Sequence, residues 1–175
     1  MKLLKLSDFT AEGIAREVAE EALRAAARMQ AALGATGGVV RPDLEGTPIY
    51  AAAFAVARYA MAGVGRGLYV PARNRLIKWL GEAEVMQAEP GAPLALAVAA
   101  AEAREALHAH APLTSMQVAI LAGLDRDYVN ALALRDQMHD AYRSDENRHR
   151  PWRFKPTVRL CKWVQERPGA VQGLC

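Results

Sequence analysis

The most constraining feature of this chain is the stretch Leu113–Leu132, which carries the spacing of two short helices joined by a tight turn. Ala119 provides the small side chain needed where two helices cross closely, and Gly123 stands at the turn, where a positive φ is often required. Thr114 and Asp125 occupy the N-cap positions of the two helices. The apolar residues that would pack the helices together are Val118, Ala122, Leu124, Val129 and Leu132. This joint spacing predicts a helix-turn-helix.

Four short segments of the chain stand where one family has its motifs: Leu113-Thr114, residues 119–124, Trp152-Arg153-Phe154 and Lys162-Trp163-Val164. Over about its last third, the chain resembles the winged helix-turn-helix of the MerR and excisionase superfamily of bacterial and phage DNA-binding proteins. In that family a Leu-Thr opening leads into Ala-x-x-Ala-Gly-Leu, a short second helix, a β-hairpin wing and a helix that carries a Trp. The segment between Leu134 and Trp152 is longer and more charged than a tight wing. The resemblance implies DNA binding through the second helix and the wing.

The second helix is expected from about residue 126 to residue 139, with its N-terminal part in the major groove. Arg and Asn side chains suit guanine and adenine edges, because each can make paired hydrogen bonds there. The residues expected to reach DNA from this helix are Arg126, Asp127, Asn130, Ala131, and Arg135 or Leu134. The carboxylate of Asp127 would be repelled by phosphates unless it accepts from a cytosine amine or pairs with a nearby Arg. An ordinary helical hairpin within a bundle is the alternative.

Basic charge is concentrated in residues 143–167, which hold eight Lys and Arg against three Asp and Glu, while the whole chain has a net charge of +3. Basic residues interleaved with Trp152 and Phe154 suit a wing that lies along DNA phosphates. The residues expected to contact the backbone are Arg143, Arg148, Arg150, Arg153 and Lys155. The alternative is a solvated loop whose aromatic side chains belong to the core.

The first two thirds of the chain are rich in Ala and poor in aromatic residues, which favours closely packed helices. We therefore expect a mainly α protein with an N-terminal helical bundle over residues 1–89 and a winged helix-turn-helix domain over residues 94–175. Helices are expected over about 11–33, 48–61, 71–87 and 94–108. The helix 48–61 is apolar on all sides except at Arg58, so it should be the buried centre of the bundle.

The sequence leaves the role of two surfaces of the N-terminal helices open. An apolar stripe on the first helix could face a partner helix of the same chain or of a second subunit: Ile14, Val18, Ala22, Ala25, Met29 and Leu33. A basic cluster on the third helix is either a solvated face or a second phosphate contact: Arg66, Arg73, Arg75 and Lys78.

The sequence offers no catalytic constellation, so neither an enzyme nor a cofactor is expected. His108 and His110 are two residues apart and do not face each other on a helix, so no metal site is expected. Cys161 and Cys175 are expected to be free thiols in a reducing cytosol. Residues 1–6 are too short and too interrupted an apolar run to be expected to form a signal peptide, and no apolar run reaches membrane-spanning length without charge, Gly or Pro, which together favour the cytoplasm and no membrane partner.

The first hypothesis for function is a sequence-specific binder of double-stranded DNA, a bacterial, phage or mobile-element transcriptional regulator. It would act as a homodimer, because one such module buries limited surface. The alternative is a phage- or plasmid-type interaction or assembly factor that uses the helix-turn-helix only as a scaffold. The sequence leaves open whether the N-terminal half binds a small-molecule ligand, a partner or itself.

Overall fold

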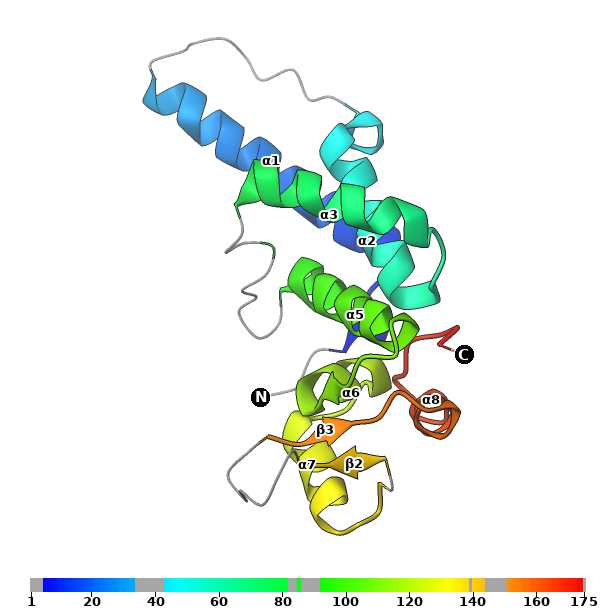
Figure 1. The fold of residues 1–175 in the computed structure, drawn as a ribbon. Coiled ribbons are helices and arrows are strands. Elements are labelled where there is room, and N and C mark those ends of the chain that lie inside the picture. The colour runs from blue at the N-terminus through cyan, green and yellow to red at the C-terminus, as the bar shows by residue number, and fades with distance from the viewer. Residues whose placement is uncertain are drawn as a thin grey trace.

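The computed structural model describes residues 5–33, 43–81, 85, 92–138, 140–143 and 151–174 and shows a mainly helical protein (Figure 1). The helices are η1 (Leu6–Asp8), α1 (Ala11–Ala32), η2 (Leu44–Gly46), α2 (Pro48–Ala62), α3 (Arg66–Leu80), α5 (Pro93–His108), α6 (Ser115–Ala122), α7 (Arg126–Leu134) and α8 (Val158–Gln165). The strands are β1 (Leu113–Thr114), β2 (Ala141–Tyr142) and β3 (Arg153–Phe154). The predicted predominance of helices is confirmed. None of the helices in the described parts of the chain combines the length and the hydrophobicity that a membrane span requires.

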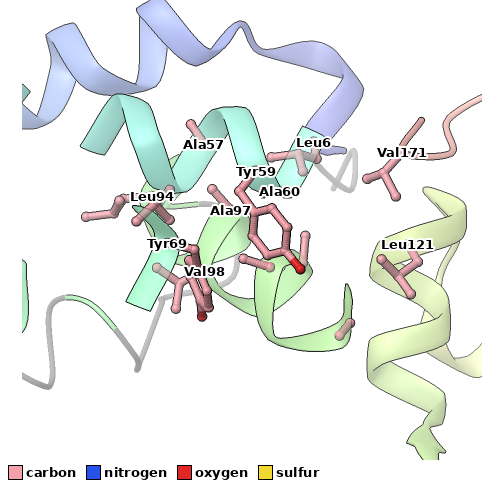
Figure 2. Packing of buried hydrophobic residues seen from close by; sticks show 14 of the residues in the cluster. Leu6, Ala57, Tyr59, Ala60, Tyr69, Leu94, Ala97, Val98, Leu121 and Val171 are labelled. Carbon is pink, nitrogen blue, oxygen red and sulfur yellow. The ribbon is translucent and has the colours of Figure 1, made fainter. Parts of the chain in front are cut away.

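α2 is the central helix of the N-terminal part, because α1, α3 and α5 all pack against it. Thr47 caps its first turn by accepting from the backbone N–H of Tyr50, and Pro48 occupies the first helical position. Val56 and Ala57 are fully buried. Figure 2 shows side chains of α2 beside those of α5. The prediction that this apolar helix lies at the centre of the bundle is confirmed.

α3 begins earlier than the sequence predicted, at Arg66 rather than at Pro71. Gly63 and Gly65 adopt left-handed backbone conformations, with φ of 72° and 86°, and the break after α2 is confined to residues 63–65. Pro71 therefore lies inside the helix, where it lacks the N–H that would bond to the carbonyl of Gly67. α3 ends at Leu80, and most of the remaining predicted helix, up to residue 87, falls outside the described residues.

The C-terminal part combines the remaining helices with a small antiparallel sheet in the order β1-β3-β2. Phe154 of β3 lies opposite both Leu113 of β1 and Ala141 of β2, and both Phe154 and Leu113 are fully buried. α5 packs against α2 on one side and α6 on another, and the buried apolar residues form one cluster. The division into domains 1–89 and 94–175 stays a prediction.

Arg104 of α5 joins the N-terminal helices to the end of the chain. Its side chain is only 1% exposed and donates to the carbonyl oxygens of Ala60 at 2.7 Å, Met61 at 3.0 Å and Gly173 at 2.9 Å. It also donates to the carbonyl oxygen of Gln172. Burial lowers the pKa of Arg104 to about 10, so the guanidinium still carries its charge at neutral pH. One buried cation thus holds α2, α5 and the C-terminal segment together.

The C-terminal segment extends this connection to α6 through its backbone. The N–H of Val171 donates to the carbonyl oxygen of Leu121 at 2.9 Å, and the N–H of Gln172 donates to that of Met61 at 3.0 Å. Gly63 leaves room for this junction, because a Cβ there would lie 3.0 Å from the Nη1 atom of Arg104. The segment therefore fixes α6 relative to α2.

Candidate nucleic-acid interface

Local hydrogen bonds define the start and end of α6. Thr114 Oγ1 accepts from the N–H of Gln117 at 3.2 Å, and Gln117 Oε1 accepts from the N–H of Thr114 at 2.8 Å, a reciprocal capping box. α6 ends at Gly123, whose φ is 62°. A Cβ at Gly123 would lie 2.2 Å from the carbonyl oxygen of Gly169, so no other residue fits. The predicted cap and turn residues are confirmed at these positions.

α7 follows after a three-residue connection and is shorter than predicted. Asp125 caps it by accepting from the N–H of Asp127 at 2.7 Å. Val129 is fully buried. The helix ends at Leu134 rather than near residue 139, because the chain turns into a left-handed conformation at Asp136, with φ of 57°. His139 lies outside the described residues.

The residues predicted to read DNA lie on α7 and its C-cap with unequal exposure. Arg126, Asp127 and Arg135 are exposed, whereas Asn130 and Ala131 are half-buried. The Nε and Nη2 atoms of Arg126 both donate to Asp127 Oδ1 at 3.2 Å. The guanidinium of Arg126 is thus engaged by the next residue along the chain. Two large apolar side chains of this helix are also exposed, Tyr128 at 52% and Leu134 at 72%.

Three of the predicted phosphate-contacting residues lie on or beside the sheet. The guanidinium of Arg143 lies 4.3 Å from the centre of the Trp152 ring, and the ammonium of Lys155 lies 5.9 Å from that of Tyr142. Arg153 is half-buried on β3, opposite Thr114 and Tyr142. The other two predicted residues, Arg148 and Arg150, lie outside the described residues.

α8 adds further basic residues to this part of the molecule. Thr157 caps the helix, and Leu160 and Val164 are buried, whereas Trp163 is half-buried with the guanidinium of Arg167 4.7 Å from its ring centre. The exposed basic residues of the helix are Arg159 and Lys162. Figure 1 shows α8 at one side of the sheet, with α7 below it.

The structure reveals a polar cluster that the sequence analysis did not find. Glu105 of α5 accepts from Arg66 of α3 through both carboxylate oxygens, at 2.9 and 3.0 Å, and from the hydroxyl of Tyr59 of α2. The bonds from Arg66 are the main reason that the pKa of Glu105 is lowered. Burial, followed by the bond to Glu105, raises the pKa of Tyr59. These partners are 39 and 46 residues from Glu105, so no local signal in the sequence could have paired them.

A second ion pair strengthens the connection between α3 and α5. Arg73 Nη2 lies 3.1 Å from Glu102 Oε1, and both side chains are partly covered. Two of the four cations in the predicted basic cluster of α3 are therefore paired within the chain, while Arg75 and Lys78 are exposed. This favours a structural role for Arg66 and Arg73 over the alternative of a second phosphate contact.

Comparison of the chain with known protein families, with curated proteins and with solved structures found no match.

Proposed function

We propose that this protein binds double-stranded DNA through a winged helix-turn-helix formed by residues 113–165. The observation that carries the proposal is the element order α6, tight turn, α7, β2, β3, with β1 completing the sheet in the order β1-β3-β2. In a winged helix-turn-helix the second helix enters the major groove, and the hairpin contacts the backbone beside it. In this interpretation α7 is the recognition helix and the β2–β3 hairpin is the wing.

The charges of the two elements suggest different roles. Residues 125–136 hold three Asp and two Arg, so α7 and its caps supply no net positive charge. The attraction to phosphates must therefore come from the basic residues of the wing and α8, which provide affinity without sequence preference. Arg126 and Asn130 of α7 would supply the base contacts, with Arg126 leaving Asp127 when it meets a base. The function would be that of a transcriptional regulator or an accessory factor of a mobile element.

The test is a fluorescence-anisotropy titration of the protein against random duplex DNA at about 50 and 200 mM salt. Six or more phosphate contacts would lower affinity by a factor on the order of a thousand between these conditions. R153A should weaken binding and reduce the slope of affinity against salt by about one. R58A removes an equal charge from an exposed position on α2 and should change neither quantity. Absence of binding at low salt would refute the proposal.

A second candidate is a protein-interaction factor whose helix pair is a docking surface. The observation that favours it is the surface of α7, where Tyr128 and Leu134 are exposed at 52% and 72% beside acidic residues. Exposed apolar groups of this size are typical of protein-binding surfaces. Under this hypothesis Y128A abolishes capture of a partner while the chain fails to bind duplex DNA. Salt-dependent DNA binding by the wild type would reject it as the main function.

A further inference from the structure

The C-terminal half of α1 exposes an apolar stripe that lies apart from the core. α1 buries Ile14, Ala15, Val18 and Ala19, but no residue from 20 to 33 is buried. Met29 is 67% exposed, and Leu33, which follows the helix, is 80% exposed. Figure 1 shows this half of α1 projecting beyond the other helices. Large apolar side chains in such a position are typical of a surface that a partner covers.

The spacing along this half is that of a helix-pairing surface. Ala22, Ala25, Met29 and Ala32 follow one another at alternating intervals of three and four residues, the a and d positions of a heptad. Small Ala side chains at three of these four positions allow a second helix to approach closely. The stripe is thus suited to a helix rather than to an extended chain.

Two charged residues beside the stripe indicate which helix fits. Glu21 and Arg28 are one heptad apart, and both occupy the g position on the same side of the stripe. They also line an open groove of about 390 Å³ between α1 and Trp79. When two copies of one helix pack antiparallel, the g positions of one face the g positions of the other. Glu21 of each copy then lies opposite Arg28 of the other copy.

A parallel arrangement would not use these charges. It would place the g position of one copy opposite the e position of the other, and the e residues are Ala26 and Leu33. Only the antiparallel arrangement pairs Glu21 with Arg28, and the two-fold axis makes the pair twice. The charge pattern is therefore self-complementary for one arrangement of one partner, a second copy of this chain.

We infer that the exposed half of α1 is a homodimer interface in which two copies of the helix pack antiparallel, centred near Arg24 and Ala25. Trp79, 45% exposed on the opposite wall of the groove, adds apolar area to the contact. A stable interface commonly buries about 800 Å² on each partner, and a stripe of about three helical turns approaches this size only with such additions. The dimer should accordingly dissociate on dilution in the micromolar range. This inference is independent of the proposed DNA binding.

The test is sedimentation velocity of the full chain without DNA, over about 1 to 100 µM protein. The wild type should pass from monomer to dimer in this range. E21R and R28E should each weaken dimerisation by about 30-fold, because each turns two attractive pairs into two repulsive ones. The double variant E21R/R28E should recover the wild-type affinity. Mixing the two single variants should produce a heterodimer, in which both pairs are again attractive.

R58E is the matched control, because it makes the same change of charge as R28E at an exposed position of α2, away from the stripe. It should dimerise like the wild type, and circular dichroism should show equal helix content in all variants. A wild type that stays monomeric overturns the inference. So does a dimer that E21R and R28E leave intact, or one that the double variant does not restore. Because the assay contains no DNA, failure here leaves the DNA-binding proposal standing.

Discussion

Arg66, Arg73 and Arg104 of α3 and α5 all bond to oxygen atoms of the chain itself, whereas cations of the C-terminal sheet lie beside aromatic rings. The first three fix the distance between helices, because a planar guanidinium satisfies several oxygens in a set geometry. Lys155 is exposed, and its ammonium lies 5.9 Å from the centre of the Tyr142 ring. A cation that lies over a ring keeps N–H groups that can still donate hydrogen bonds to a phosphate.

This comparison distinguishes charged side chains that hold the fold together from charged side chains that can bind a partner. Replacing Arg66, Arg73 or Arg104 should cost stability and leave affinity for an anion unchanged. In the wing and α8, replacing a cation should cost little stability and lower affinity for DNA. Four substitutions, in order of expected effect, test the contacts that hold the fold together and the charge that is available to a partner.

The largest expected effect is that of R104M, which should lower the free energy of unfolding by about 3 kcal/mol, because four carbonyl oxygens lose a buried charged donor. The measurement is denaturant unfolding followed by circular dichroism. R104K retains the charge but not the planar set of donors, so its loss should be intermediate. If R104M unfolds at the wild-type midpoint, Arg104 does not hold the helices and the C-terminal segment together.

The next effect is that of G123A, expected to destabilise the protein by about 2 to 3 kcal/mol, because the residue has a positive φ and its Cβ would meet the backbone of Gly169. Thermal unfolding measures this loss. G67A is the matched control in α3, where a Cβ meets no atom within 4 Å. It should stabilise the chain by about 0.5 to 1 kcal/mol, because Ala is the better helix former. Equal effects for the two variants would contradict the tight contact at the turn.

A smaller effect is expected for E105Q, which should lower stability at pH 7 by about 1 kcal/mol through weaker bonds to Arg66 and Tyr59. The folded-state pKa of Glu105 is lowered from 4.5, so its stabilisation is complete above that value and is lost as pH falls through the folded pKa. Denaturant unfolding of the wild type and E105Q between pH 7 and pH 3 should show that the difference in their free energies of unfolding decreases in acid. E17Q, exposed on α1, is the control. A difference in the free energy of unfolding that does not change with pH would contradict the lowered pKa of Glu105.

A residue's role could be predicted from the sequence where the signal for it is local. Thr114, Gly123 and Asp125 could be predicted because a cap or a tight turn is made by residues only two to four positions apart. The predicted start of α3 was wrong because Pro71 is a typical first residue of a helix, and because Gly67, a poor helix former, lies inside the first turn of the true helix. The oxygens that Arg104 binds belong to residues 43 to 69 positions away. Only its small, buried neighbours in α5, such as Ala103, could have indicated a buried cation.

The DNA-contacting residues stay a prediction, and D127N is the substitution that tests α7 most directly. Asp127 Oδ1 accepts from Arg126, while only the backbone N–H of Asp127 is used by the cap at Asp125. D127N should therefore leave the fold intact, remove one negative charge and release Arg126. If α7 lies in the major groove, affinity for duplex DNA should rise about 3- to 10-fold, since one repulsion is lost and one cation becomes available.

Fluorescence anisotropy of D127N and wild type with the same duplex measures this gain, and E12Q, exposed at the start of α1, controls for net charge alone. A gain shared equally by E12Q would mean that overall charge is responsible and that α7 makes no special contact. Unchanged affinity in D127N, together with a loss in R153A, would assign DNA binding to the wing alone. The apolar surface of Tyr128 and Leu134 would then be available to a protein partner, because a helix outside the groove leaves both side chains uncovered.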